Sequence, residues 1–97
     1  MATYVTLLNF TERGVKDIKD SSKRAAELRN HAKKHGIKIK EQFWCMGVYD
    51  GLVIFEAPDD ESATAAMLSL SSRGNVTTQT LRSFTSSEMD GILGKVT

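Results

Sequence analysis

Two short segments of this chain are apolar on both sides of an extended backbone, and they limit its possible folds more than any other feature. Residues 4–10 read Tyr-Val-Thr-Leu-Leu-Asn-Phe, and residues 52–56 read Leu-Val-Ile-Phe-Glu. Neither segment contains Gly or Pro, and both are rich in β-branched and aromatic side chains, which favours strands. Because successive side chains of a strand point to opposite faces, both segments are expected to be central strands with apolar groups on each face.

A main helix is expected between residues 23 and 35. Its apolar positions recur at helical spacing, opposite a side rich in Lys and Arg; they are Ala25, Leu28, Ala32 and His35. Gly36 follows as a natural helix stop.

A second helix is expected to begin after Asp59, whose side chain can cap it, and to end near Ser72 before Gly74. A short helix is also expected after Thr85, because Thr85 and Glu88 have the spacing of a capping box.

Two further segments alternate between apolar and polar residues and are expected to be half-buried strands. In the segment 37–46, one face is expected to carry Ile37, Ile39, Phe43 and Cys45, and the other Lys38, Lys40, Gln42, Trp44 and Met46. Cys45 is therefore expected to be a buried small side chain. The segment 75–84 alternates in the same way and is expected to be the last strand.

The element order is therefore β-α-β-β-α-β with a tail helix, in one domain covering residues 1–97. It predicts an α+β, ferredoxin-like βαββαβ fold: a four-stranded antiparallel sheet with two helices on one face and a short C-terminal helix. The two central strands then leave apolar groups on the face without helices. Because a large exposed apolar patch usually marks an interaction surface, a second copy of the chain is expected to cover it; the tail helix is the alternative cover.

Composition excludes several classes of site. Hydrophobic residues make up 40% of the chain and charged residues 26%, as in ordinary globular proteins, and a single cysteine excludes an internal disulfide and a Cys/His zinc cluster. No signal peptide and no apolar run of roughly 20 residues is present, so we expect a cytoplasmic protein that meets no membrane. No cofactor is expected.

Several short motifs distributed along the chain resemble the GYD-domain family of small, mostly bacterial proteins. They are residues 1–5 (Met-Ala-Thr-Tyr-Val), 9–11 (Asn-Phe-Thr) with Gly14, 19–21 (Lys-Asp-Ser), 46–50 (Met-Gly-Val-Tyr-Asp), 56–60 (Glu-Ala-Pro-Asp-Asp), 74–76 (Gly-Asn-Val) and 80–85 (Thr-Leu-Arg-Ser-Phe-Thr). The resemblance implies a ferredoxin-like domain related to dimeric α/β-barrel proteins, and it implies no reaction. The family signature is changed here, because Val48 stands between Gly47 and the Tyr-Asp pair.

The signature supplies two candidate ligand-binding residues, Tyr49 and Asp50, at the turn between the second and third strands. A phenol beside a carboxylate can bind or protonate a small ligand, but Asp also favours turns and Tyr often fills a core with its hydroxyl at the rim. Arg82 is a third candidate, because its guanidinium can hold a ligand carboxylate. The alternative for Arg82 is an ion pair with Glu41, Glu56 or Asp50, or with a partner subunit.

Other polar and aromatic side chains are weaker candidates. Trp44 is expected to line either a ligand pocket or a packed contact, and Asn9 interrupts an apolar strand, where its amide needs partners. His31 and His35 lie one helical turn apart and can reach one metal ion, although two ligands are too few for a site. Metal binding is therefore not expected.

Three functions follow, in order of preference. The first is a self-associating domain that is structural or binds a small molecule. The second is a cofactor-free oxygenase or isomerase acting on a small aromatic or carbonyl compound in a pocket lined by Trp44, Tyr49, Asp50 and Arg82. The last is nucleic-acid binding through the basic stretch of residues 23–40, and nucleic acid is the least expected partner.

Overall fold

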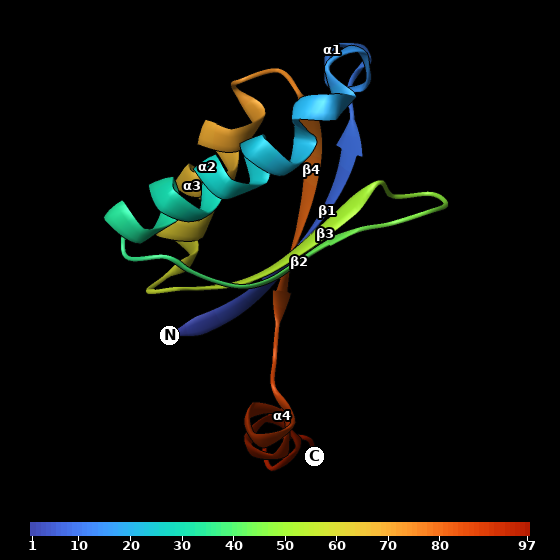
Figure 1. Ribbon diagram of the computed structural model, residues 1–97. Coiled ribbons are helices and arrows are strands. Elements are labelled where there is room, and N and C mark those ends of the chain that lie inside the picture. The colour runs from blue at the N-terminus through green and yellow to red at the C-terminus, as the bar shows by residue number, and fades with distance from the viewer.

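The computed structural model describes residues 1–97 and contains the predicted elements in the predicted order (Figure 1). They are β1 (Ala2–Phe10), α1 (Glu12–Lys16), the 3₁₀ turn η1 (Ile18–Asp20), α2 (Ser21–Lys34), β2 (Lys38–Trp44), β3 (Gly51–Ala57), α3 (Asp60–Ser71), β4 (Val76–Ser83) and α4 (Ser86–Leu93). Both apolar segments are strands, and α2, α3 and α4 lie where their patterns predict them.

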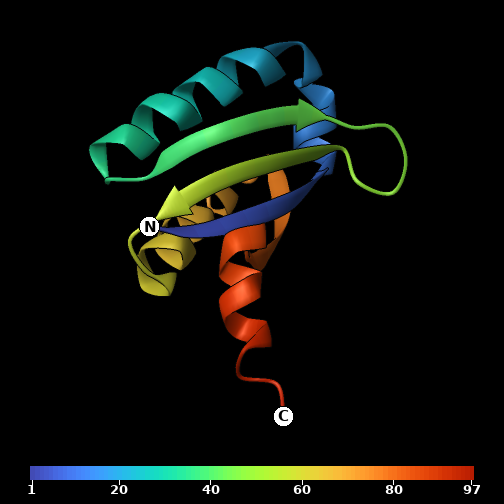
Figure 2. The ribbon, with the colours of Figure 1, turned by 90° about the horizontal axis from the view of Figure 1, so that it is seen from below.

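The four strands form one antiparallel sheet in the order β2-β3-β1-β4. The two strands with apolar groups on both faces, β1 and β3, are therefore the central ones. Helices α2 and α3 lie on the same side of the sheet and leave the opposite side without a helix layer (Figures 1 and 2). The predicted ferredoxin-like α+β fold is confirmed.

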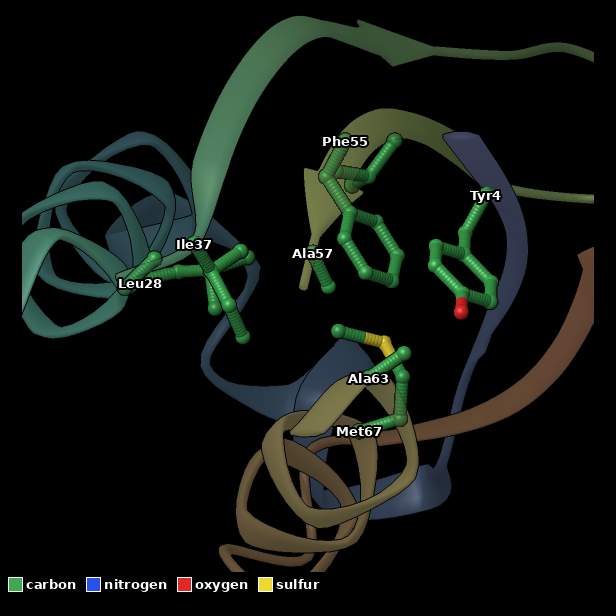
Figure 3. Packing of buried hydrophobic residues seen from close by; sticks show 9 residues of the cluster. Tyr4, Leu28, Ile37, Phe55, Ala57, Ala63 and Met67 are labelled. Carbon is green, nitrogen blue, oxygen red and sulfur yellow. The ribbon is translucent and has the colours of Figure 1, made fainter. Parts of the chain in front are cut away.

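The core lies between the sheet and these two helices (Figure 3). Tyr4 of β1 stacks on Phe55 of β3, with ring centroids 5.3 Å apart, and Met67 of α3 packs in the same cluster. Thr6 is the buried polar residue of this layer. Its hydroxyl lies 2.9 Å from the Thr80 hydroxyl and 3.2 Å from the Met67 sulfur, so it is buried with hydrogen-bond partners.

The helix starts follow their capping residues. An Asp59 carboxylate oxygen accepts a hydrogen bond from the Ser62 backbone N–H at 2.8 Å, and this bond holds the pKa of Asp59 below its usual value. Thr85 and Glu88 form both bonds of the predicted capping box, and the bond from the Thr85 N–H likewise lowers the pKa of Glu88. These two predictions are confirmed.

Strand β2 departs from the predicted alternation. Its register against β3 shifts between Ile39 and Glu41, which marks a β-bulge that turns every later side chain to the other face. Phe43 therefore lies on the face without helices rather than beside Ile39, and Trp44 lies on the helix side. The prediction for Cys45 is also wrong, because Cys45 is exposed in the loop after β2.

Helix α4 stands clear of the sheet and of α2 and α3 (Figures 1 and 2). None of its residues is buried, and its apolar side chains Met89 and Leu93 are exposed. The radius of gyration is 14.6 Å, against about 12.5 Å for a compact domain of this length. The tail helix therefore lengthens the molecule, and it does not cover the free side of the sheet.

Candidate functional site

The face of the sheet turned away from α2 and α3, called the outer face, carries an apolar surface that crosses all four strands. We define it by Val5 and Leu7 of β1, Phe43 of β2, Leu52 and Ile54 of β3, and Leu81 of β4. The strand registers arrange them in two rows. Val5 lies opposite both Ile54 and Leu81, and Leu52 lies opposite both Leu7 and Phe43.

The side chains of the outer face remain open to solvent to different degrees. Phe43 and Leu81, on the two edge strands, are 52% and 45% exposed, whereas those on the central strands are half-buried by their neighbours. Lys40 and Glu56 form a 3.8 Å ion pair beside the apolar rows. An apolar centre beside charged residues is the usual composition of a protein-binding surface.

Tyr49 closes one end of the outer face. Its hydroxyl donates a 3.0 Å hydrogen bond to the side-chain oxygen of Gln79 on β4. Because β1 lies between β3 and β4, the tyrosine must cross β1 to reach Gln79. On β1 this end of the outer face also carries Asn9, which is half-buried. The structure thus brings Tyr49 and Asn9 to the same part of the surface.

Asp50 attaches the loop between β2 and β3 to strand β1. One carboxylate oxygen accepts the Phe10 backbone N–H at 2.9 Å, and the Asp50 backbone N–H donates to the Leu8 carbonyl oxygen at 2.8 Å. The Asp50 carbonyl oxygen accepts the Cys45 N–H at 2.8 Å. Residues 47–50, the altered family signature, therefore fasten this loop to β1 through Asp50 and to β4 through Tyr49.

Arg82 lies at the other end of β4, near the start of α4. Its guanidinium carbon lies 4.5 Å from the centre of the Phe84 ring and 5.6 Å from that of Tyr4, and one of its nitrogens lies 4.0 Å from the Glu88 carboxylate. Arg82 thus forms an ion pair, as predicted, but its partner is Glu88 and none of the three acidic residues named from the sequence. Glu88 was missed because it belongs to the tail helix, whose position the sequence does not determine.

A hydrogen-bonded pair near Arg82 escaped the sequence reasoning. The Tyr4 hydroxyl donates to a carboxylate oxygen of Asp60 at the start of α3, and this bond raises the pKa of Tyr4 above its usual value. The two residues line a hollow of about 380 Å³ between α3 and β4, with Thr80 and Arg82. The sequence signals were weak: a tyrosine in an apolar strand and an acid in a first helical turn.

A separate pocket of about 110 Å³ lies beneath α2 on the helix side of the sheet. Among the sequence candidates, Trp44 and Asp50 line it; Tyr49 and Arg82 do not. The Trp44 indole N–H donates to the Ser21 hydroxyl of α2 at 2.7 Å. The four residues expected to line one catalytic pocket are thus divided among the outer face, this pocket and the Arg82 hollow, and the predicted four-residue pocket is not formed.

His31 and His35 lie side by side on α2, with ring centroids 4.6 Å apart. Both line a hollow between α2 and α3 whose lining contains no acidic residue and no cysteine. No group of three or more His, Cys, Asp or Glu side chains is arranged to hold a metal ion anywhere in the chain. The pair supplies two imidazoles without a third ligand.

The loop between β2 and β3 is a second exposed apolar feature, and the sequence reasoning missed it. Met46 is fully exposed and Val48 is 85% exposed, and the loop projects beyond the end of the sheet (Figures 1 and 2). The sequence feature that could have revealed this loop is the presence of apolar side chains in a turn. As for membranes, none of the helices has the length and apolar character needed to cross one.

Comparison with known proteins identifies the family of this chain. The family model of the GYD domain matches residues 4–93. The chain is also similar to a protein from Thermus thermophilus described as a glutamine synthetase and cystathionine beta-lyase binding protein. The two are 32% identical over 82 residues, which is 84% of this chain and 86% of the relative. With the predicted strands, helices and signature residues in place, this chain belongs to the GYD domain family.

Proposed function

We propose that this protein is a self-associating, protein-binding domain, in which the outer face packs against the outer face of a second copy. The observation that supports this most strongly is the pair of apolar rows that crosses β2, β3, β1 and β4. The helices α2 and α3 cover only the opposite side of the sheet, so these rows are left open. Its relative's description as a binding protein for two enzymes supports the protein-binding part.

A second copy is the occupant that the geometry favours. Each copy presents the same apolar rows, so a two-fold axis through the outer face brings matching apolar surfaces together. Apolar burial contributes roughly 25 cal/mol per Å², and a stable interface needs about 800 Å² from each partner. The four-strand width of the outer face and the exposed stripe of α4 can supply apolar surface for such an interface.

Helix α4 has a place in this assembly. It stands clear of its own body (Figure 1), and its apolar residues Met89 and Leu93 are 43% and 53% exposed. A helix with an open apolar stripe is stabilised by packing it against another surface. In the proposed dimer, α4 of each copy lies against the body of the other.

Sedimentation equilibrium with matched variants tests the self-association. Leu81→Glu places a charge on the outer face at an edge position that is already 45% exposed, so the protomer should still fold. Leu68→Glu makes the same change on α3, on the helix side, where Leu68 is 65% exposed. We expect a dimer for the natural chain and for Leu68→Glu, and a monomer for Leu81→Glu. A monomeric natural chain at about 1 mM, or an unchanged dimer in Leu81→Glu, would contradict the proposal.

The enzyme-binding part has its own test. Purified glutamine synthetase and cystathionine β-lyase from the organism that encodes this chain are the first partners to examine, because the relative is described by them. We expect co-elution of the dimer with at least one of them in size-exclusion chromatography. Replacing Met46 and Val48 by serine should weaken the complex if the β2–β3 loop contacts the enzyme. Absence of co-elution with both enzymes would count against this part and leave the dimer test unaffected.

A further inference from the structure

We propose that the pocket beneath α2 is a binding site for a small α-amino acid with an apolar side chain. The pocket lies beneath α2, and Phe43 and Leu52 of the outer face are also among its lining residues. The inference goes beyond the proposed function and does not depend on it, because it needs no second copy of the chain. It follows from the shape of the pocket, from the charges of its lining and from its size.

The pocket exists because the side chains facing it are too small to fill the space. Helix α2 turns Ser21 and Ala25 toward the sheet over one half of its length, whereas the larger Leu28 fills the middle. On the sheet, a Cβ at Gly51 would already contact the Phe43 carbonyl oxygen at 3.2 Å and the Leu8 side chain at 3.4 Å, so the gap comes from the small side chains of α2. Protein interiors are normally close-packed, so a gap of this kind between a helix and a sheet suits a ligand better than a core.

The floor of the pocket is apolar, and its charged groups are of both signs. Leu8, Phe10 and Val53 line the apolar part. The charged lining residues are Arg24, Glu27, Asp50 and Arg73. Two positive and two negative side chains therefore surround one apolar space.

None of these four charges has an oppositely charged partner. The ion pairs of this chain are Lys40 with Glu56 and Arg82 with Glu88, so neither arginine of the pocket is paired with a carboxylate. Arg24 donates to the carbonyl oxygens of Asp17 and Gly14, which orient its guanidinium without neutralising it.

Arg73 and Asp50 retain free hydrogen-bonding capacity. Arg73 makes no side-chain hydrogen bond, and Asp50 uses one carboxylate oxygen on the Phe10 N–H and leaves the other free. A ligand with only a carboxylate would meet two acids, and one with only an amine would meet two guanidinium groups. A zwitterion satisfies both sets.

Size sets the remaining limit. A bound water needs roughly 10–15 Å³ of cavity, so the 110 Å³ found here has room for about ten non-hydrogen atoms. Leucine and methionine have about this many atoms, and phenylalanine slightly more. The apolar floor would receive the side chain, Arg73 the carboxylate, and Asp50 the ammonium group.

The test is a titration of the full-length, ¹⁵N-labelled protein followed by NMR. The probes are L-leucine, L-methionine and L-phenylalanine, with 3-phenylpropanoate as a ligand lacking the amine and 2-phenylethylamine as one lacking the carboxylate. We expect at least one amino acid to shift the Gly51 amide and the Trp44 indole signals. We also expect it to bind about tenfold more tightly than either half-ligand, since each half loses a charge-assisted contact.

Matched variants locate the site. Ala25→Leu fills the pocket and should abolish binding, whereas Ala26→Leu, one position along α2 and exposed, should not change it. Arg73→Gln should weaken binding of the amino acid and of 3-phenylpropanoate, but not of 2-phenylethylamine. Asp50→Asn, which keeps an oxygen for the Phe10 N–H, should weaken the amino acid and the amine.

Three results would overturn the inference. They are no shift with any of the three amino acids up to about 10 mM, a half-ligand that binds as tightly as the amino acid, and unchanged binding in both Ala25→Leu and Arg73→Gln. The spectra also report whether each variant is folded. If Ala25→Leu does not fold, Arg73→Gln and Asp50→Asn decide.

Discussion

At the scale of single residues, the family signature acts through hydrogen bonds that hold a loop to two strands. Asp50 binds the backbone of β1 with both its carboxylate and its main chain, while Tyr49 reaches Gln79 on β4. The sequence left a binding role open for both residues, beside a turn role for Asp50 and a packing role for Tyr49. Their contacts favour a structural role for Tyr49, whose hydroxyl is bonded to Gln79, whereas Asp50 also has a carboxylate oxygen free for the proposed ligand.

Removing the Asp50 side chain should therefore destabilise the fold. In Asp50→Ala the Phe10 N–H loses its acceptor, and we expect the free energy of unfolding to fall by about 1–2 kcal/mol. Asp50→Asn keeps an acceptor oxygen and should lose less. Urea denaturation followed by circular dichroism measures both, with Asp90→Ala on the exposed α4 as control. A stability of Asp50→Ala equal to that of the natural chain would show that the bond is not needed.

The titration of Asp59 is expected to make the stability of the fold depend on pH. Its usual pKa is 3.8, and the hydrogen bond from the Ser62 N–H lowers the pKa in the folded state. A carboxyl group whose pKa is lower in the folded than in the unfolded state stabilises the fold at pH values above its unfolded-state pKa. This stabilisation is lost as the pH falls through the folded-state pKa. Asp59→Asn keeps the cap but cannot titrate.

We accordingly expect the two proteins to have similar Tm at neutral pH. Between about pH 5 and pH 3, the Tm of the natural chain should fall further than that of Asp59→Asn. Differential scanning fluorimetry across this range is the measurement. Parallel curves for the two proteins would mean that the Asp59 cap does not contribute to acid sensitivity.

At the scale of elements, close contact between α1 and the start of β4 depends on one glycine. A Cβ at Gly14 would lie 2.1 Å from the Asn75 carbonyl oxygen, far inside contact distance, and that oxygen also accepts the Thr11 N–H. Backbone atoms at this junction cannot move away as a side chain can. Gly14 is therefore required by packing, which its place in a short helix does not reveal.

Gly14→Ala should lower the free energy of unfolding by about 2–3 kcal/mol, the usual cost of forcing atoms into a packed site. Gly91→Ala is the matched control, because a Cβ there meets nothing within 4 Å and alanine favours the helix α4 by up to about 1 kcal/mol. Chemical denaturation of both variants gives the comparison. Equal stability of the two variants would show that the packing of Gly14 against Asn75 does not exclude a side chain.

At the scale of the whole molecule, one side of the sheet is covered by helices and the other is open. Only 12 of 97 residues are buried, so the isolated chain has a small core for its length, and association should add to its stability. We expect the Tm to rise by several degrees between about 1 µM and 1 mM protein, because mass action favours the folded dimer.

Scanning calorimetry at several protein concentrations checks this expectation. Leu81→Glu should remove the concentration dependence and Leu68→Glu should keep it. A Tm independent of concentration in the natural chain would mean that the outer face contributes nothing to stability through a second copy.

The sequence alone determined the elements, the order of the strands and most helix ends of this protein. Strand and helix patterns and capping residues such as Asp59 and Thr85 act over a few neighbouring positions, so they can be read locally. The right-handed connection rule then placed β1 and β3 in the centre of the sheet. Apolar residues on both faces of these two strands also predicted that one apolar face would be left without helices.

Only the tertiary structure decided which candidate residues meet. The bulge in β2 separated Phe43 from Ile39, the position of α4 paired Arg82 with Glu88, and the packing of α2 over the sheet placed Trp44 and Asp50 in one pocket without Tyr49. Each of these outcomes depends on contacts between segments far apart in the chain. A one-residue shift or a change in helix direction moves such contacts by several ångströms, while the local sequence pattern remains nearly unchanged.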